Sequence, residues 1–285
     1  MKTLVIYHGK CPDGFGAALS AWLKLKDTAD YLPAEHGAYP SPRVTGRDVY
    51  ILDFSFPRPT LEQMRADAKS LTILDHHKTA QEVLHDFPGA VFDMKKSGAR
   101  LAWEHFHPGA PVPRLIQYIE DRDLYNWQYE ETERFTAVLD TLPFTFEAWH
   151  SFLLKCEDRD AMAKILVDGQ AMTLKFNALA EEQVLGAEPV TVDGILGLKL
   201  NAGGRFTDKL GELMHARSNA FGMLWRIQDG MLRVSFRSAR GGIDVSALAK
   251  KFGGGGHAAA ASFRIPLDNP RFELFFRTYI LGAGK

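Results

Sequence analysis

The sequence is poor in cysteine, in long apolar stretches and in net charge, and each shortage excludes a class of protein. Its 285 residues include two cysteines, too few for a disulfide scaffold or a four-cysteine zinc site, and this scarcity is typical of a reducing compartment. No stretch approaches the ~20 apolar residues of a membrane helix, and the first residues lack the features of a secretory signal. With 34 basic and 35 acidic residues the formal net charge is −1, so the chain has no basic excess for coating long nucleic acid. We therefore expect a globular cytoplasmic protein without a membrane partner.

The near-zero net charge conceals an uneven distribution. Residues 1–165 carry 19 basic and 24 acidic side chains, a net of −5, whereas residues 166–285 carry 15 basic and 11 acidic side chains, a net of +4. Such a difference can arise by chance, or it can mark an acidic site in the first part of the chain. The positions of the acidic residues decide between these interpretations.

Three segments near the N-terminus share one design, in which a short apolar or β-branched run ends in a side chain that can bind metal. The segments are residues 4–8, 49–53 and 71–75. Continuous apolar runs of this length are typical of strands buried on both faces. Helical patterns follow at residues 16–25 and 60–68, so the βα order predicts a mostly parallel sheet. Because the C-terminal ends of parallel strands line a ligand crevice, His8, Asp53 and Asp75 should converge at one edge.

The remaining pattern predicts a second domain. Residues 159–185 alternate polar and apolar side chains at helical spacing without proline, and Gly186 and Pro189 end that helix. Beyond it, predicted strands at 195–200, 220–227 and 232–236 alternate with helices at 206–216 and 245–252. We predict an α/β fold with an N-terminal, mostly parallel domain over residues 1–158, a helical linker over 159–188 and a smaller α/β domain over 189–285.

The strongest local signal for chemistry is Asp75-His76-His77 at the end of a predicted buried strand. Adjacent histidines point in different directions, so one can ligate a metal while the other donates a hydrogen bond to a bound oxyanion. The alternative is a helix-start aspartate followed by two solvated histidines, which the two other strand ends disfavour. Imidazole and carboxylate donors without a thiolate pair fit Mn²⁺, Mg²⁺ or Fe²⁺ better than structural zinc.

The first predicted strand runs through a turn, residues 9–14, into a helix. The glycines of this turn allow His8 and Asp13 to approach the same point. The segment lacks the GK[ST] ending of a phosphate-binding P-loop, and Leu19 stands where a dinucleotide fingerprint needs its third glycine. A plain strand-to-helix turn is the alternative interpretation.

Near the C-terminus, four consecutive glycines precede a histidine. Backbone N–H groups of Gly254, Gly255 and Gly256 can form an anion-binding nest, to which His257 adds a hydrogen bond or a charge. A flexible linker is the alternative, disfavoured by the predicted helix and strand on either side. Arg237, at the end of a predicted strand, is a further candidate for binding substrate.

Taken in order, these motifs resemble those of the DHH phosphoesterase superfamily, and the resemblance spans nearly the whole chain. Its members hydrolyse phosphoric esters or anhydrides, typically at a dimetal site and usually with manganese. The last motif resembles the glycine-rich signature of the DHH-associated C-terminal domain. The motifs are His8…Pro12-Asp13-Gly14, Leu52-Asp53, Asp75-His76-His77, Asp121-Arg122-Asp123 and Gly253-Gly254-Gly255-Gly256-His257.

The resemblance implies a role for each matching residue. His8 and Asp13 would bind the first ion, and Asp53 would bridge both ions. His76 and Asp121 would serve the second ion, Asp75 would lie close to the metals, and His77 would face the substrate phosphate. Arg237, which resembles the family's substrate-gripping arginine, and the Gly254–His257 segment would hold the substrate. The repeated Asp-Arg-Asp leaves the register open; Asp123 is the alternative ligand, and a salt bridge with Arg122 is its favoured role.

One position departs from the family pattern. The first motif commonly has two aspartates two residues apart, each serving a different ion, but here Phe15 follows Asp13 at that spacing. Three outcomes are open: water fills the gap, Cys11 or another carboxylate takes the place, or only one ion binds well.

These features predict a metal-dependent phosphoesterase that hydrolyses phosphodiester bonds of short oligonucleotides or dinucleotides with metal-activated water. The predicted cofactor is one or two Mn²⁺ ions, with Mg²⁺ or Fe²⁺ as alternatives. Hydrolysis of pyrophosphate, polyphosphate or 3′-phosphoadenosine 5′-phosphate is the alternative activity, and a binding module that has lost catalysis is the alternative class. The partner is a small phosphorylated substrate and not a long duplex; a homodimer is left open.

Overall fold

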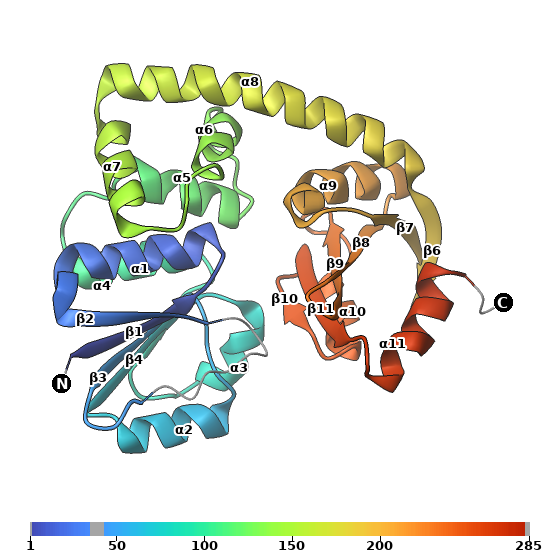
Figure 1. Cartoon of the computed structure of the whole chain (residues 1–285). Helices are drawn as coiled ribbons and strands as arrows, with labels where there is room; N and C mark the ends of the chain where they lie inside the picture. Colours follow the sequence, from blue (N-terminus) through green and yellow to red (C-terminus); the bar gives the residue numbers. More distant parts are fainter. Residues whose placement is uncertain (1, 35–42, 283–285) are drawn as a thin grey trace. The chain divides into compact units, whose positions relative to one another are not determined.

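The chain forms two units, each built on its own β-sheet. The computed structural model describes residues 2–34 and 43–282, and the chain divides into Met1–Thr173 and Leu174–Lys285 (Figure 1). Each unit combines a β-sheet with helices, so the predicted α/β class is confirmed. The predicted linker, residues 159–188, contains helix α8 (Arg159–Gln183), and the two units divide within that helix. Within the described ranges, no helix combines the length and apolar character needed to span a bilayer.

The first unit contains a five-stranded sheet in the order β2-β1-β3-β4-β5. All four neighbouring pairs of strands are parallel, as predicted. The central strands β1, β3 and β4 are the three apolar runs of the sequence, whereas the edge strands β2 and β5 were not predicted. The strands are β1 (Thr3–His8), β2 (Ala29–Ala34), β3 (Asp48–Leu52), β4 (Ser70–Asp75) and β5 (Ala90–Phe92).

Helices cover both faces of this sheet, which explains why its strands are continuously apolar. Successive side chains of a strand point to opposite faces. Val5 and Tyr7 therefore pack in the core formed with α1, α4, α5, α6 and α7, while Leu4 and Ile6 pack in the core on the side of α2 and α3 (Figure 1). These helices are α1 (Pro12–Leu25), α2 (Arg58–Asp67), α3 (Gln81–Leu84), α4 (Gly98–Phe106), α5 (Arg114–Asp123), α6 (Thr132–Leu139) and α7 (Phe146–Glu157).

The second unit contains a six-stranded mixed sheet in the order β10-β11-β9-β8-β7-β6. Its one parallel pair among the described strands is β7 with β8, which the crossover helix α9 (Thr207–Ser218) connects. The other pairs are antiparallel. The strands are β6 (Glu188–Val192), β7 (Ile195–Asn201), β8 (Phe221–Gln228), β9 (Met231–Ser238), β10 (Gly255–Gly256) and β11 (Ala260–Pro266).

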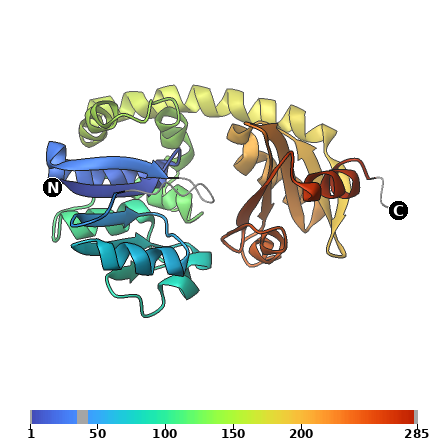
Figure 2. The ribbon, with the colours of Figure 1, turned by 60° about the horizontal axis from the view of Figure 1, so that its bottom comes forward.

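Two apolar clusters hold the second unit together. Leu210 and Met214 of α9 pack against Leu224 of β8 in one cluster. The other cluster joins the sheet to α10 (Val245–Lys251) and α11 (Pro270–Phe275), which lies beside the strands in Figure 2. Short turns complete the chain: 3₁₀ segments η1 (Lys26–Thr28), η2 (Lys78–Ala80), η3 (Val184–Gly186) and η4 (Gly204–Phe206), and the π-helical η5 (Phe276–Ile280).

Candidate metal centre

The C-terminal ends of β1, β3 and β4 bring metal-binding side chains together, as the parallel sheet predicts. β3 lies between the other two strands, so Asp53, which directly follows β3, takes the central position. Asp53 Oδ2 lies 3.3 Å from His8 Nδ1, and Asp53 Oδ1 lies 3.1 Å from His76 Nε2. Asp53 adopts a left-handed backbone with φ of 58°, while its N–H donates to Leu74 O at 2.8 Å. This sharp turn at the strand end aims the carboxylate at both histidines.

Three carboxylates surround the imidazole of His76. Its Nε2 atom lies 3.1 Å from Asp53 Oδ1, 3.4 Å from Asp13 Oδ2 and 3.5 Å from Asp123 Oδ2. Asp13, Asp53 and His76 are each at most 2% exposed. Carboxylate groups of like charge repel each other in such a buried place unless a positive charge lies among them.

The N-terminus of α4 holds Asp13 in this group. Gly98 N–H donates to Asp13 Oδ2 at 2.6 Å, and Ala99 N–H donates to Asp13 Oδ1 at 2.9 Å. A helix N-terminus favours a negative charge because its first N–H groups are unpaired and its dipole is positive there. Position 98 must be glycine, because a Cβ atom there would lie 2.4 Å from Asp53 Cβ. The start of α4 therefore fixes two of the three carboxylates.

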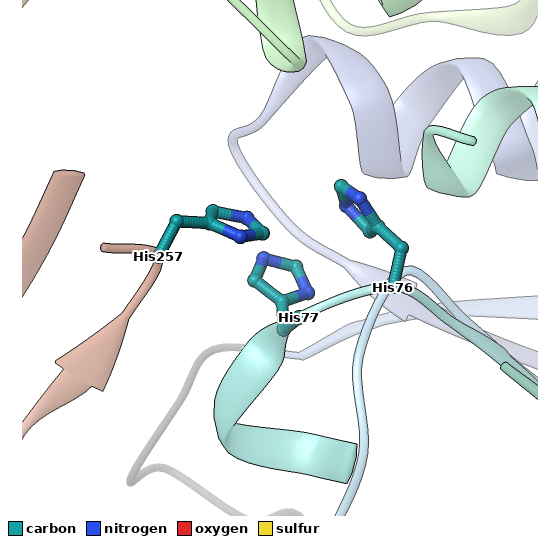
Figure 3. Close-up of side chains that lie close together, drawn as sticks. All are labelled: His76, His77 and His257. Atoms are coloured by element: carbon teal, nitrogen blue, oxygen red, sulfur yellow. The ribbon is translucent and has the colours of Figure 1, made fainter. Parts of the chain in front are cut away.

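Asp75 orients the two histidines that follow it. Its Oδ1 atom accepts hydrogen bonds from the backbone N–H groups of His76 and His77 at 2.7 and 3.1 Å, and it lies 2.8 Å from His77 Nδ1. Figure 3 shows the imidazoles leaving adjacent positions after β4; their planes meet at 60°. With Nδ1 at Asp75, the Nε2 atom of His77 lies on the opposite side of the ring. The two imidazoles thus point in different directions and contact different carboxylates, His76 that of Asp53 and His77 that of Asp75.

Burial and neighbouring charges shift the pKa values of the buried group. Burial, with the charges of Asp53 and Asp123, raises the pKa of Asp13 well above its usual value. Burial alone would raise the pKa of Asp53, but hydrogen bonds with His76 and His8 hold it well below the usual value. Burial opposes protonation of His76, yet its hydrogen bond to Asp53 and the charges of Asp123 and Asp13 raise its pKa to about 11. The surroundings therefore stabilise a cation at this point.

The donor set fits a divalent cation. Nitrogen and carboxylate oxygen donors are the ligands of Mn²⁺, Mg²⁺ and Fe²⁺. Asp75 Oδ2 is buried and has no hydrogen-bond partner among the described residues, so one acceptor of the group is left for an ion or a water. Two groups of side chains could each hold an ion, because the ligand atoms within each group lie within 4.8 Å of one another. One group is His8, Cys11 and Asp53. The other is Asp13, His76 and Asp123, whose His76 lies beside Asp53.

The register of Asp121-Arg122-Asp123 differs from the expected one: Asp123, and not Asp121, lies in the cluster. Asp121 accepts hydrogen bonds from the N–H groups of Gln128 and Tyr129 at 2.8 and 3.3 Å and from the Thr132 hydroxyl. Its carboxylate thus closes the turn between α5 and α6. The structure thus places Asp121, the predicted ligand of the second ion, outside the group of potential ligands that contains Asp123, and these donors occupy its oxygens.

The favoured role of Asp123 is also corrected. The Arg122 Nη1 atom lies 3.0 Å from both carboxylate oxygens of Asp140, so the principal salt bridge of this arginine is with another residue. Asp123 is the last residue of α5. Side chains two residues apart on a helix differ in direction by about 200°, so Asp121 and Asp123 point to opposite sides of α5. The end of this helix therefore supplies one carboxylate to the turn before α6 and another to the cluster around His76.

The side chains of the first motif, His8 to Gly14, belong to different ligand groups from those expected. Asp13 lies with His76 and Asp123, whereas the group around His8 contains Cys11. The structure thus groups Asp13 with His76 and Asp123, and not with His8, with which it was expected to share an ion. Phe15 is not a gap in the ligand set: it is 2% exposed and its ring stacks on Phe146 at 5.1 Å, inside the aromatic core.

In the second unit, Arg237 and His257 belong to one end of the sheet. Arg237 of β9 pairs in register with Ala260 of β11, and His257, drawn in Figure 3, follows β10. The His257 N–H donates to Ala260 O at 2.8 Å. The Arg237 guanidinium donates from Nε and Nη2 to Asp208 Oδ1 at 2.8 and 2.7 Å. Asp208 thus orients this arginine near the turn that carries His257.

The glycines before His257 are required by close backbone packing. A Cβ at Gly254 would lie 2.1 Å from Ser262 O, and one at Gly256, whose φ is 138°, would lie 2.5 Å from Ala260 O. The Gly254 N–H already donates to Ala249 O at 2.9 Å, while Gly255 and Gly256 form β10. The Gly254 N–H, one of the donors of the expected anion nest, is therefore already used within the protein.

Comparisons with known proteins agree with this architecture. Residues 203–277 match the DHHA1 domain family. The uncharacterized protein R106 of Acanthamoeba polyphaga mimivirus is 27% identical over 283 residues; the match covers 90% of this chain and 66% of that protein, so the chain spans about two thirds of its relative.

Two solved structures share the fold. A DHH domain from a protein described as a member of a family of ribosomal proteins aligns with a TM-score of 0.62 at 12% identity, covering 96% of this chain and 85% of that chain. An exopolyphosphatase-related protein from Bacteroides fragilis aligns with a TM-score of 0.50 at 13% identity, covering 97% and 91%. Both alignments extend over the two units, which carry the DHH-type arrangement of a parallel sheet followed by a mixed sheet.

Proposed function

We propose that the chain, whose residues 203–277 match the DHHA1 domain family, is a DHH-type phosphoesterase: a divalent-metal-dependent hydrolase of phosphodiester bonds in short oligonucleotides or dinucleotides. The observation that carries this proposal is the set of three carboxylates within 3.5 Å of His76 Nε2. Such a buried concentration of negative charge needs a cation, and it lies at the strand ends where ligands bind in parallel sheets. Manganese is the proposed ion because the donors are carboxylate and imidazole.

Each residue of the cluster has a distinct task in this proposal. When bound, divalent ions supply an activated water and neutralise the oxygens of an in-line displacement at phosphorus. Asp53 faces both ligand groups and would join them. Asp13, His76 and Asp123 would hold one ion, and α4 keeps Asp13 in place through its N–H groups.

His77 would bind the scissile phosphate. Asp75 accepts the Nδ1 hydrogen of His77 at 2.8 Å, which fixes the ring and directs Nε2 away from Asp75. Held in this way, the Nε2 side of the ring would face a phosphate oxygen of the substrate. Asp75 is therefore a positioning residue, whereas His77 touches the substrate.

Short substrates fit the charge of the chain better than long ones. The net charge of −1 provides no extended electrostatic surface for a long polyanion, whereas Arg237 and His257 in the DHHA1 unit are suited to one terminal phosphate or base. Hydrolysis of pyrophosphate or polyphosphate is the second candidate, because a neighbour of the same fold is described as exopolyphosphatase-related. Dephosphorylation of 3′-phosphoadenosine 5′-phosphate is a further alternative, tested beside these two activities.

A panel of substrates tests the proposal. The purified chain, with manganese, is offered pApA, a short RNA, 3′-phosphoadenosine 5′-phosphate, pyrophosphate and polyphosphate, and product release is followed by chromatography. We expect release of mononucleotides from pApA and the RNA, and a loss of at least ~100-fold for His77→Ala, as for loss of a general acid–base or phosphate-binding group. Consumption of pyrophosphate alone, with His257→Ala without effect, would refute the oligonucleotide substrate.

A further inference from the structure

Cys11 stands at the junction of β1 and α1, beside the metal-binding side chains. It is the N-cap residue of α1, with an extended backbone, and its side chain makes no capping hydrogen bond. Its Sγ atom, a ring nitrogen of His8 and a carboxylate oxygen of Asp53 all lie within 4.8 Å of one another. The thiol of Cys11 and the imidazole of His8 are also hydrogen-bonded. The thiol is thus directed at the cluster and not at the helix that begins beside it.

The spacing Cys11-Pro12-Asp13 separates the two ligand groups. Cys11 precedes α1 with an extended backbone, whereas Asp13 lies in the first turn of that helix. Asp13 accordingly lies with His76 and Asp123, while Cys11 lies with His8 and Asp53. Each group therefore contains one side chain from this short segment. Asp53 lies between the groups, with its two carboxylate oxygens 3.3 Å from His8 Nδ1 and 3.1 Å from His76 Nε2.

We propose that Cys11 is a thiolate ligand of the ion that His8 and Asp53 hold. This inference rests on the proposed function, because it presupposes a divalent ion in that cluster. On binding, the S–H bond of Cys11 breaks, a sulfur–metal bond forms, and the proton leaves to the solvent, so that one thiol proton is released for each ion bound there.

The two ion positions consequently differ in character. The position formed by His8, Cys11 and Asp53 offers one nitrogen, one sulfur and one oxygen, whereas Asp13, His76 and Asp123 offer nitrogen and oxygen only. A soft thiolate favours ions late in the first transition series, such as Fe²⁺, Co²⁺ or Zn²⁺, over Mn²⁺ and Mg²⁺. The thiolate position is therefore selective for a softer ion and its neighbour for a hard one.

Absorption spectroscopy with cobalt tests the proposal without measuring activity. The full chain is depleted of metal and titrated with Co²⁺, and the near-ultraviolet band of thiolate-to-cobalt charge transfer is recorded together with the visible bands of bound cobalt. The variants are Cys11→Ser, Cys11→Asp and, as a matched control, Cys156→Ala, which alters the second cysteine in the aromatic core of the first unit.

We expect the charge-transfer band in the wild type and in Cys156→Ala, and its complete loss in Cys11→Ser and Cys11→Asp. Cys11→Asp should still bind cobalt, seen in the visible bands, because a carboxylate replaces the thiolate as ligand. A wild type that binds cobalt without the band overturns the proposal, as does a band that persists in Cys11→Asp or disappears in Cys156→Ala.

The proposed function is tested separately. Manganese-dependent hydrolysis of pApA by the wild type, with no thiolate band in its cobalt form, would refute the thiolate ligand and leave the phosphoesterase intact. A thiolate band in a chain that hydrolyses none of the phosphate esters would refute the proposed activity and retain the ligand.

Discussion

Replacing Asp121 and Asp123 separately by asparagine distinguishes a carboxylate that holds the fold from one that serves the ion. The two residues lie in the last turn of α5, and the substitution hardly changes the size of the side chain. Asp121 accepts two backbone N–H groups and the Thr132 hydroxyl, whereas Asp123 Oδ2 lies 3.5 Å from His76 Nε2. We expect Asp121→Asn to lose stability and Asp123→Asn to lose metal binding.

The expected loss of stability follows from the buried donors around Asp121. An asparagine side chain has one acceptor oxygen in place of two, so at least one of the three donors loses its partner. The free energy of unfolding should fall by about 2 kcal/mol. For a unit of this size, a loss of 1 kcal/mol lowers the Tm by about 2–4 °C. The Tm of Asp121→Asn should therefore be roughly 4 to 8 °C below that of the wild type. Asp123→Asn removes a charge that repels Asp13 and Asp53, so the Tm of the metal-depleted variant should equal or exceed that of the wild type.

Manganese should remove most of the difference in Tm between the two variants. At ~100 times its Kd, one bound ion stabilises the wild type by about 2.7 kcal/mol, a rise in Tm of roughly 5 to 11 °C. Residues that only orient a metal ligand typically contribute about 10- to 100-fold in affinity, so the loss of a ligand should reach ~100-fold. The same manganese concentration then stabilises Asp123→Asn by about 0.4 kcal/mol, a rise of roughly 1 to 2 °C.

Thermal unfolding followed by circular dichroism, after chelation and with added manganese, measures both effects on the three proteins. Asp121→Asn should retain the full shift from its lower starting Tm. The reasoning is refuted if Asp123→Asn shows the wild-type manganese shift while Asp121→Asn shows none.

Three further substitutions test the surroundings of the site. Phe15→Asp should unfold at lower urea concentration, with a loss of about 3 kcal/mol or more for removing a buried aromatic ring, and should gain no manganese-dependent turnover; a large gain would show that position 15 reaches an ion. Gly98→Ala should displace Asp53, against whose Cβ the new methyl group would lie at 2.4 Å; a calorimetric titration should show weaker manganese binding, and unchanged affinity would contradict the packing. Asp75→Asn should reduce kcat less than His77→Ala, because a positioning residue acts only through the ring it holds; equal turnover of the wild type and His77→Ala would exclude His77 from the reaction.

The sequence identifies the central part of the first unit because its signals are local. The apolar runs of β1, β3 and β4 each end in a polar side chain, and the parallel pairing of these strands makes their ends meet. The strands predicted at 195–200, 220–227 and 232–236 are confirmed as β7, β8 and β9. In contrast, the edge strand β5 has only three residues, and β2 contains a proline and exposed positions, so their composition carries no comparable signal.

The division of ligands could not be predicted from spacing alone. Whether Cys11 or Asp13 lies near His8 depends on the residue at which α1 begins, and element boundaries are the least certain part of a prediction from one sequence. The register of Asp121 and Asp123 depends on Thr132 and on the backbone of residues 128–129, which tertiary folding brings to Asp121. Side-chain hydrogen bonds across an irregular turn of this kind leave no periodic pattern in the sequence.

The central claim, that a cation held by the buried carboxylates performs phosphodiester hydrolysis, has one direct test. The wild type and Asp123→Asn are depleted of metal, and the rate of pApA hydrolysis is measured as manganese is titrated back. We expect no hydrolysis by either protein without added ion, saturable recovery by the wild type, and recovery by Asp123→Asn at roughly 100-fold higher manganese. Hydrolysis that persists in the chelated wild type, or recovery of both proteins at the same manganese concentration, would contradict the claim.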